Sequence, residues 1–310
     1  MFVGHGLLAF ALVALAGERL GWDRPAVVRV AVLAGLFATL PDVDVVYGLA
    51  GLLGGVDAAG VAESFWAAGN RVHRGVTHSL VVGLVTAAAV WPLARRPGDR
   101  SPRAWLPPVA GLALLGGGVA GVALLSGPLA GAIAGLFAAG AVGLVWLAGR
   151  AGLSARATAG SALVGLCTHP FGDLFTGSPP TFLYPLDATL VGERVTLAAD
   201  PTLHLLGAFG VELAVVWLAL FVAFRLTDRR LARAVDRRAG LGALYGVAAL
   251  ALPAPTLEVS YHFVFSVLAV GSVGVVPPTS LRARLPRAAA TAVATVTVAA
   301  VAYACVYALA

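Results

Sequence analysis

The sequence predicts an all-α fold, a polytopic transmembrane helical bundle with about eight to ten spans. Hydrophobic residues make up 59% of the chain and charged residues 12%, whereas roughly a quarter of the residues in soluble proteins are charged. Runs of ~20 apolar residues recur, each long enough to cross a ~30 Å hydrocarbon core. The arginines fall mainly between those runs. These observations indicate an integral membrane protein whose immediate partner is the lipid bilayer.

The apolar runs define the predicted spans in chain order. They cover residues 3–18, 26–50, 77–94, 104–125, 128–149, 157–176, 203–224, 239–256, 258–276 and 288–309. The fourth and fifth spans, and the eighth and ninth, are so close in sequence that each pair predicts a helical hairpin. Pro253 and Pro255 interrupt the eighth span, because proline cannot continue a helix. We therefore expect a single membrane domain over 1–310, with a motif-bearing part at 1–202 and additional helices at 203–310.

The basic residues, all of them arginine, predict the orientation of the chain. If successive spans alternate in direction, the arginine-rich loops fall on one side, which the positive-inside rule makes cytoplasmic. Because these residues form no continuous basic stripe with interleaved aromatics, no nucleic-acid partner is expected. Under this topology all six histidines fall in the outer half: His5, His73, His78, His169, His204 and His262.

Carboxylates accompany the histidines in two segments. His169 and Asp173 are four residues apart, which places both on one helix face within reach of one metal ion or of each other. Asp42 and Asp44 are two apart and do not share a helix face, so one could bridge metal ions while the other orients a ligand or caps a helix. Ionisable groups at membrane depth need a partner, and a divalent metal suits imidazole and carboxylate together.

The densest polar cluster is His73-Arg74-Gly75-Val76-Thr77-His78-Ser79. Gly75 allows a turn between the two histidines, and Thr77 or Ser79 could cap the following helix. Arg74 could hold phosphate oxygens through its planar fork or anchor the chain at lipid headgroups. His5 lies between two glycines, where a metal could approach closely. His204, two turns above Glu212, and His262 have weaker contexts.

Taken in order, these motifs resemble the YdjM-type family of inner-membrane proteins, which are regarded as metal-dependent hydrolases. The resemblance covers residues 4–176, and a proline-containing aromatic segment at 182–187 also fits it. It implies a metal site made of His5, Asp42, Asp44, His73, His78, His169 and Asp173. The family is more distantly similar to zinc-dependent phospholipase C and to P1-type nucleases, whose zinc clusters cleave phosphoesters.

The expected activity is hydrolysis of a phosphoester, including that of a lipid, at the outer face of the inner or plasma membrane. The expected cofactor is a divalent metal, zinc first and Mn or Fe as alternatives, with one to three ions. Asp42 or Asp44 would act as general base, and Arg74 would stabilise charge on the substrate. Two alternatives are a metal-ion or small-solute transporter and a non-catalytic membrane protein with a structural metal. The absence of histidines from the inner half favours a one-sided site over a transport pathway.

Overall fold

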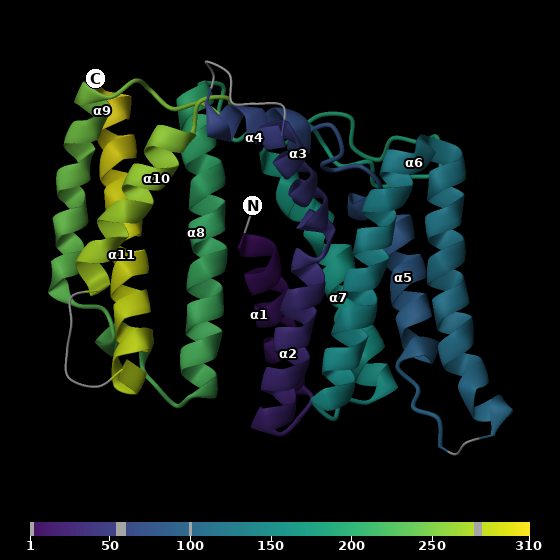
Figure 1. Ribbon diagram of the computed structural model, residues 1–310. Helices are drawn as coiled ribbons and strands as arrows, with labels where there is room; N and C mark the ends of the chain where they lie inside the picture. Colours follow the sequence, from purple (N-terminus) through teal and green to yellow (C-terminus); the bar gives the residue numbers. More distant parts are fainter. Residues whose placement is uncertain (1–2, 54–59, 99–100, 276–280) are drawn as a thin grey trace. The chain divides into compact units, whose positions relative to one another are not determined.

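The computed structural model describes residues 3–53, 60–98, 101–275 and 281–310 (Figure 1). The described residues form helices and no strands, which confirms the predicted all-α class. Two compact units divide the chain: the first contains the residues up to Leu174 together with Ser178–Arg194, and the second contains Phe175–Gly177 and Val195–Ala310. This division lies close to the boundary predicted at residues 202 and 203. The single membrane domain over 1–310 stays a prediction.

The elements are given in chain order, α denoting an α-helix and η a 3₁₀-helix. The first part of the chain holds α1 (Gly4–Arg19), α2 (Arg24–Thr39), η1 (Pro41–Tyr47), α3 (Gly48–Leu53), α4 (Val61–Gly69), η2 (Val76–His78), α5 (Leu80–Leu93), η3 (Pro102–Trp105), α6 (Leu106–Arg150), α7 (Ala155–Gly172) and η4 (Asp173–Phe175). The second holds α8 (Pro201–Leu226), η5 (Leu231–Arg233), η6 (Arg237–Val247), α9 (Ala248–Ala251), α10 (Tyr261–Val270), η7 (Gly271–Val275) and α11 (Leu281–Leu309).

The long element α6 is a folded-back pair of helices. Gly127 has φ 87° and ψ 173°, which is not helical, and Pro128 follows it. A Cβ placed on Gly131 would lie 2.5 Å from the Cβ of Ala123. Eight residues of straight helix would separate these positions by ~12 Å, so the two arms run back along each other. The hairpin predicted from 104–125 and 128–149 is confirmed.

Fewer helices are long enough to span a bilayer than the apolar runs suggest. By length and composition, the described part of the chain has three such stretches, Pro102–Arg150, Pro201–Leu226 and Leu285–Leu309, or four if the bent pair Arg24–Thr39 and Pro41–Leu53 is one span. The count differs from eight to ten for two reasons. The first stretch contains both arms of the α6 hairpin. Other apolar runs form helices that are too short, such as α1 and α5, or that bend, as by 41° at Pro41.

Close packing of α2 against α7 positions the site in the first unit. A Cβ on Gly165 of α7 would lie 2.5 Å from the carbonyl oxygen of Ala34 and 2.7 Å from the backbone nitrogen of Ala38, both in α2. Small residues at a contact let two helix backbones approach closely in lipid. Phe37 and Leu166 fill the core beside this contact. Figure 1 shows α1, α2 and α7 side by side, as their mutual contacts require.

The second unit has a more aromatic core. Phe263 and Tyr303 are almost fully buried there, with ring centroids 5.1 Å apart. The second predicted hairpin appears as η6 and α9 followed by α10, and Tyr245 contacts Ser266 through a 2.6 Å hydrogen bond. Residues 252–260, which include both prolines, connect these segments without a helix. Residue 276, the predicted end of the ninth span, lies outside the described residues.

Candidate metal centre

Six separate elements of the first unit bring the seven predicted ligands together. His5 lies in the first turn of α1, the two aspartates in η1, His73 in the turn after α4, His78 at the end of η2, His169 in the last turn of α7 and Asp173 at the start of η4. The side-chain contacts that join them link His5, Asp42, Asp44, His73, His78, His169 and Asp173 into one cluster. The sequence reasoning therefore found residues that are neighbours in space, and their roles as ligands stay predictions.

Most of this cluster is buried. Asp44, His78 and His169 are fully enclosed, whereas the side chain of Asp42 keeps 21% of its surface exposed. Burying charged groups is unfavourable unless they are paired or bind a metal. Asp42 is therefore the carboxylate that solvent or a substrate reaches most easily.

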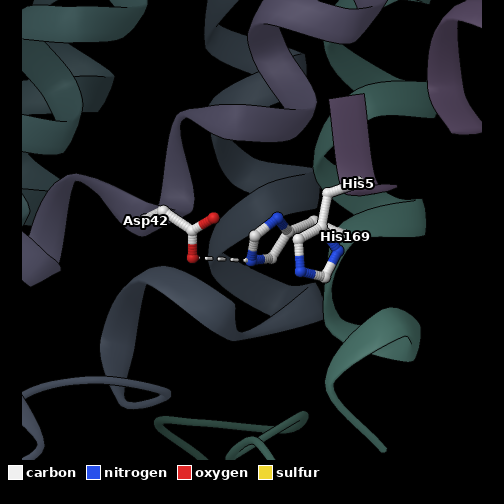
Figure 2. Close-up of side chains that lie close together, drawn as sticks. All are labelled: His5, Asp42 and His169. Carbon is white, nitrogen blue, oxygen red and sulfur yellow. Dashed lines mark ion pairs between the residues drawn. The ribbon is translucent and has the colours of Figure 1, made fainter. Parts of the chain in front are cut away.

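Three imidazole nitrogens converge on two carboxylates. His78 Nε2 lies 3.6 Å from Asp42 Oδ1 and 3.3 Å from Asp173 Oδ2. His169 Nε2 lies 3.6 Å from the same Asp42 oxygen, a contact drawn in Figure 2, and 3.9 Å from Asp173 Oδ2. His5 Nε2 lies 3.4 Å from Asp173 Oδ1, and the rings of His5 and His169 lie next to each other in Figure 2.

These spacings fit a shared cation. The Nε2 atoms of His5, His78 and His169 are buried and form no hydrogen bond to any described residue. Two ligands, each ~2.1 Å from a tetrahedral zinc ion, are roughly 3.4 Å apart, which is close to most of the separations observed here. Three overlapping sets of side chains have ligand atoms within 4.8 Å of one another: His5, Asp42 and His169; Asp42, His73 and His78; and His78, His169 and Asp173. The residues present therefore suit a divalent metal.

The backbone of α2 orients His169. Its Nδ1 lies 2.6 Å from the carbonyl oxygen of Ala38. A carbonyl can only accept a hydrogen bond, so Nδ1 carries the proton and Nε2 presents a lone pair to the carboxylates. Metal-binding histidines commonly hold their second ring nitrogen in this way.

Asp44 has different surroundings from Asp42. Its Oδ1 lies 2.9 Å from His73 Nδ1, and its Oδ2 accepts a 2.8 Å hydrogen bond from the Thr77 hydroxyl. The same Oδ2 lies 3.3 Å from His78 Nδ1. None of the three metal-compatible sets found among the described residues includes Asp44. As their spacing predicted, the two aspartates of η1 occupy different places.

Arg74 lies against the cluster in an uncommon backbone conformation. Its φ of 64° is in the left-handed region, which costs a non-glycine residue energy and is frequent at functional sites. One guanidinium nitrogen donates to the Ser178 carbonyl at 2.9 Å and the other lies 3.5 Å from Asp173 Oδ1. The Arg74 carbonyl accepts a hydrogen bond from the Thr181 amide at 3.1 Å.

The segment at 178–184 holds the His73–Ser79 turn in place. Ser79 caps α5 by accepting from the Val81 and Val82 amides, and its hydroxyl lies within hydrogen-bonding distance of the Phe182 and Tyr184 carbonyls. Of the two predicted caps, Ser79 is therefore the one used, whereas Thr77 bonds to Asp44. No sequence pattern indicates the backbone partners at Ala38 and Ser178, because every residue has a carbonyl.

The weaker candidates lie in the second unit. The buried His204 accepts a 3.1 Å hydrogen bond at Nδ1 from the Leu197 amide. His262 is exposed beside an apolar cavity, and Glu212 lies on α8. No metal-compatible set among the described residues contains any of the three.

Apolar helices long enough to cross a bilayer, together with a buried cluster of histidines and aspartates, define a helical membrane protein with a candidate metal centre. The model of the YdjM inner membrane protein family matches residues 1–232, and the chain belongs to this family. The predicted resemblance is thereby confirmed, and the matched region contains every predicted ligand. No curated protein and no solved structure matches the chain. The more distant similarity to phospholipase C and P1-type nucleases stays a prediction.

Proposed function

We propose that this protein is a membrane-embedded, metal-dependent hydrolase that cleaves a phosphoester, including that of a lipid, at the extracytoplasmic face. The main support is the convergence of three buried Nε2 atoms, from His5, His78 and His169, on the carboxylates of Asp42 and Asp173. Nitrogen atoms that are buried without a hydrogen bond are costly, and a bound cation would remove that cost.

Zinc is the leading candidate for the metal, and Mn or Fe also suits this mixture of nitrogen and oxygen ligands. Because the three compatible sets share members, they would accommodate one to three ions. A divalent cation supplies Lewis-acid chemistry, lowering the pKa of water and offsetting charge on phosphoryl oxygens.

The protein side chains would bind and orient the substrate around that centre. Asp42 is better placed than the enclosed Asp44 to accept a proton from an attacking water, because part of its side chain reaches solvent. Arg74 could hold a phosphoryl oxygen, since its guanidinium already lies beside Asp173. The predicted placement of the arginine-rich loops on the cytoplasmic side supports an outward-facing site.

The test is to measure metal content and phosphodiesterase activity of the purified protein beside His78→Ala and Asp173→Ala. We expect the parent to contain zinc or a related metal and to turn over a phosphodiester. Both variants should lose bound metal and at least about 100-fold in activity, because changes even to residues behind the ligands cost 10–100-fold.

His262→Ala is the matched control, because this exposed histidine belongs to none of the compatible sets in the described residues. Undiminished turnover in both His78→Ala and Asp173→Ala would exclude the proposed hydrolase. Bound metal without turnover of any phosphoester would favour a structural metal, and metal uptake into liposomes would favour a transporter.

A further inference from the structure

Asp44 is surrounded by hydrogen-bond donors. Its carboxylate, fully enclosed, has Oδ1 2.9 Å from His73 Nδ1, and Oδ2 2.8 Å from the Thr77 hydroxyl and 3.3 Å from His78 Nδ1. An ionised carboxylate can only accept hydrogen bonds. His73 Nδ1 and the Thr77 hydroxyl therefore each donate a proton to Asp44.

The position of the Thr77 proton determines that of the His78 proton. The Thr77 hydroxyl donates its single proton to Asp44, so its oxygen can act only as an acceptor towards His78 Nδ1, 3.0 Å away. His78 Nδ1 thus faces two acceptors, the Thr77 hydroxyl oxygen and Asp44 Oδ2. It must therefore carry a proton. In a neutral ring, the form that can bind a metal, the lone pair is then on Nε2, the atom that faces Asp42 and Asp173.

We propose that Asp44 and Thr77 are positioning residues and that Asp44 is not itself a metal ligand. They hold His73 and His78 with Nδ1 protonated, as the Ala38 carbonyl holds His169. The centre then has an inner layer containing Asp42 and an outer layer containing Asp44, although the two aspartates are separated by a single residue. This inference rests on the proposed metal centre for its purpose, but its hydrogen-bond pattern exists without a metal.

The first test observes the ring nitrogens directly in the metal-free protein. In protein labelled with ¹⁵N-histidine, His78→Ala identifies the His78 signals. We expect His78 Nδ1 in the parent to carry a hydrogen-bonded proton. In Asp44→Asn the amide has one acceptor and one donor end, so an imidazole that faces the NH₂ group should give up its Nδ1 proton.

Thr77→Val provides a second variant that keeps the side-chain shape and removes only the hydroxyl. It should change the His78 Nδ1 signal while leaving that of His73 in place. Thr158→Val is its matched control, because Thr158 is also buried but bonds only to the Ser154 carbonyl of its own helix start. Unaltered His73 and His78 signals in Asp44→Asn would overturn the inference, as would an unprotonated His78 Nδ1 in the parent.

The second test separates a ligand from a positioning residue by zinc titration against a competing chelator. Asp44→Asn should bind the parent's number of zinc ions at saturation with about 10–100-fold weaker affinity, whereas Asp42→Asn should bind fewer ions. Loss of a zinc ion in Asp44→Asn, or unchanged affinity, would refute the assignment. If the parent binds no metal, the proposed hydrolase fails, and the ¹⁵N spectra alone decide the role of Asp44.

Discussion

His169 in the first unit and His204 in the second are both buried histidines with opposite hydrogen-bond arrangements. Each has Nδ1 bonded to the backbone and a buried Nε2 without a hydrogen bond to any described residue. The partner of His169 is a carbonyl, whereas that of His204 is the Leu197 amide. An amide N–H donates, so His204 Nδ1 must be the lone-pair nitrogen, and its Nε2 must carry the proton.

The comparison shows that burial alone does not distinguish a candidate ligand from a packed histidine. The backbone group behind the ring determines which nitrogen can bind a cation. His169 directs its lone pair towards Asp42 and Asp173, whereas the Nε2 of His204 is a donor. His169 therefore suits a metal centre, and His204 connects the start of α8 to the segment before it.

The largest effect that would test this comparison is on metal binding. His169→Ala should lower the metal content and reduce hydrolysis by more than about 100-fold, because a ligand contributes at least as much as the residues that orient one. His204→Ala should keep the metal content of the parent. Metal analysis of both purified variants, with helical content checked by circular dichroism, makes the measurement. Equal metal loss in the two folded variants would break the distinction.

A smaller effect should follow from replacing Arg74, which contacts the same carboxylate as His169. Its fork contacts Asp173 and the Ser178 carbonyl together, and lysine cannot reproduce two contacts in that geometry. Arg74→Lys should lower kcat/KM about tenfold, the loss of roughly 1.4 kcal/mol of transition-state stabilisation, with unchanged metal content. Arg71→Lys, at an exposed position nearby, is the control. Parent-like kcat/KM in Arg74→Lys would show that positive charge alone suffices.

Sequence reasoning predicted the members of the site better than their arrangement. The closeness of His169 to Asp173, and the different surroundings of Asp42 and Asp44, follow from helix geometry, so both could be anticipated. The carbonyl behind His169 and the amide behind His204 could not, because every residue carries both groups and only packing selects one. The sequence allows Thr77 to cap α5, yet its hydroxyl bonds to Asp44, which lies 33 residues earlier in the chain.

The fold was predictable to a similar extent. Composition indicated the helical class, and the closeness of the apolar runs 104–125 and 128–149 indicated the α6 hairpin, which turns at Gly127. The number of spanning helices was less accessible, because an apolar run has the same composition whether it forms one straight helix or a bent pair. The bend at Pro41 illustrates this. It divides the predicted span 26–50 into α2 and the short helix η1, which carries Asp42 and Asp44.

The smallest predicted effect concerns the helix contact that gives His169 its carbonyl partner. Gly165 lies one turn before His169, and a Cβ there would lie 2.5 Å from the Ala34 oxygen and 2.7 Å from the Ala38 nitrogen. Backbone atoms cannot move aside alone, so Gly165→Ala must push α2 away from α7. Such overpacking costs about 1–3 kcal/mol. If about 1 kcal/mol of it weakens the Ala38–His169 contact, zinc affinity falls roughly fivefold.

Gly160→Ala on the same helix isolates this effect. A Cβ at Gly160 meets nothing within 4 Å, and alanine favours a helix over glycine by about 0.8–1.0 kcal/mol. This variant should melt at or slightly above the temperature of the parent and bind zinc equally well, while Gly165→Ala melts lower and binds zinc more weakly. If the two variants have the same melting temperature and zinc affinity, alanine is equally harmless at Gly165, where the helices are close, and at Gly160, which is open. The close approach of α2 and α7 would then not hold His169 in place.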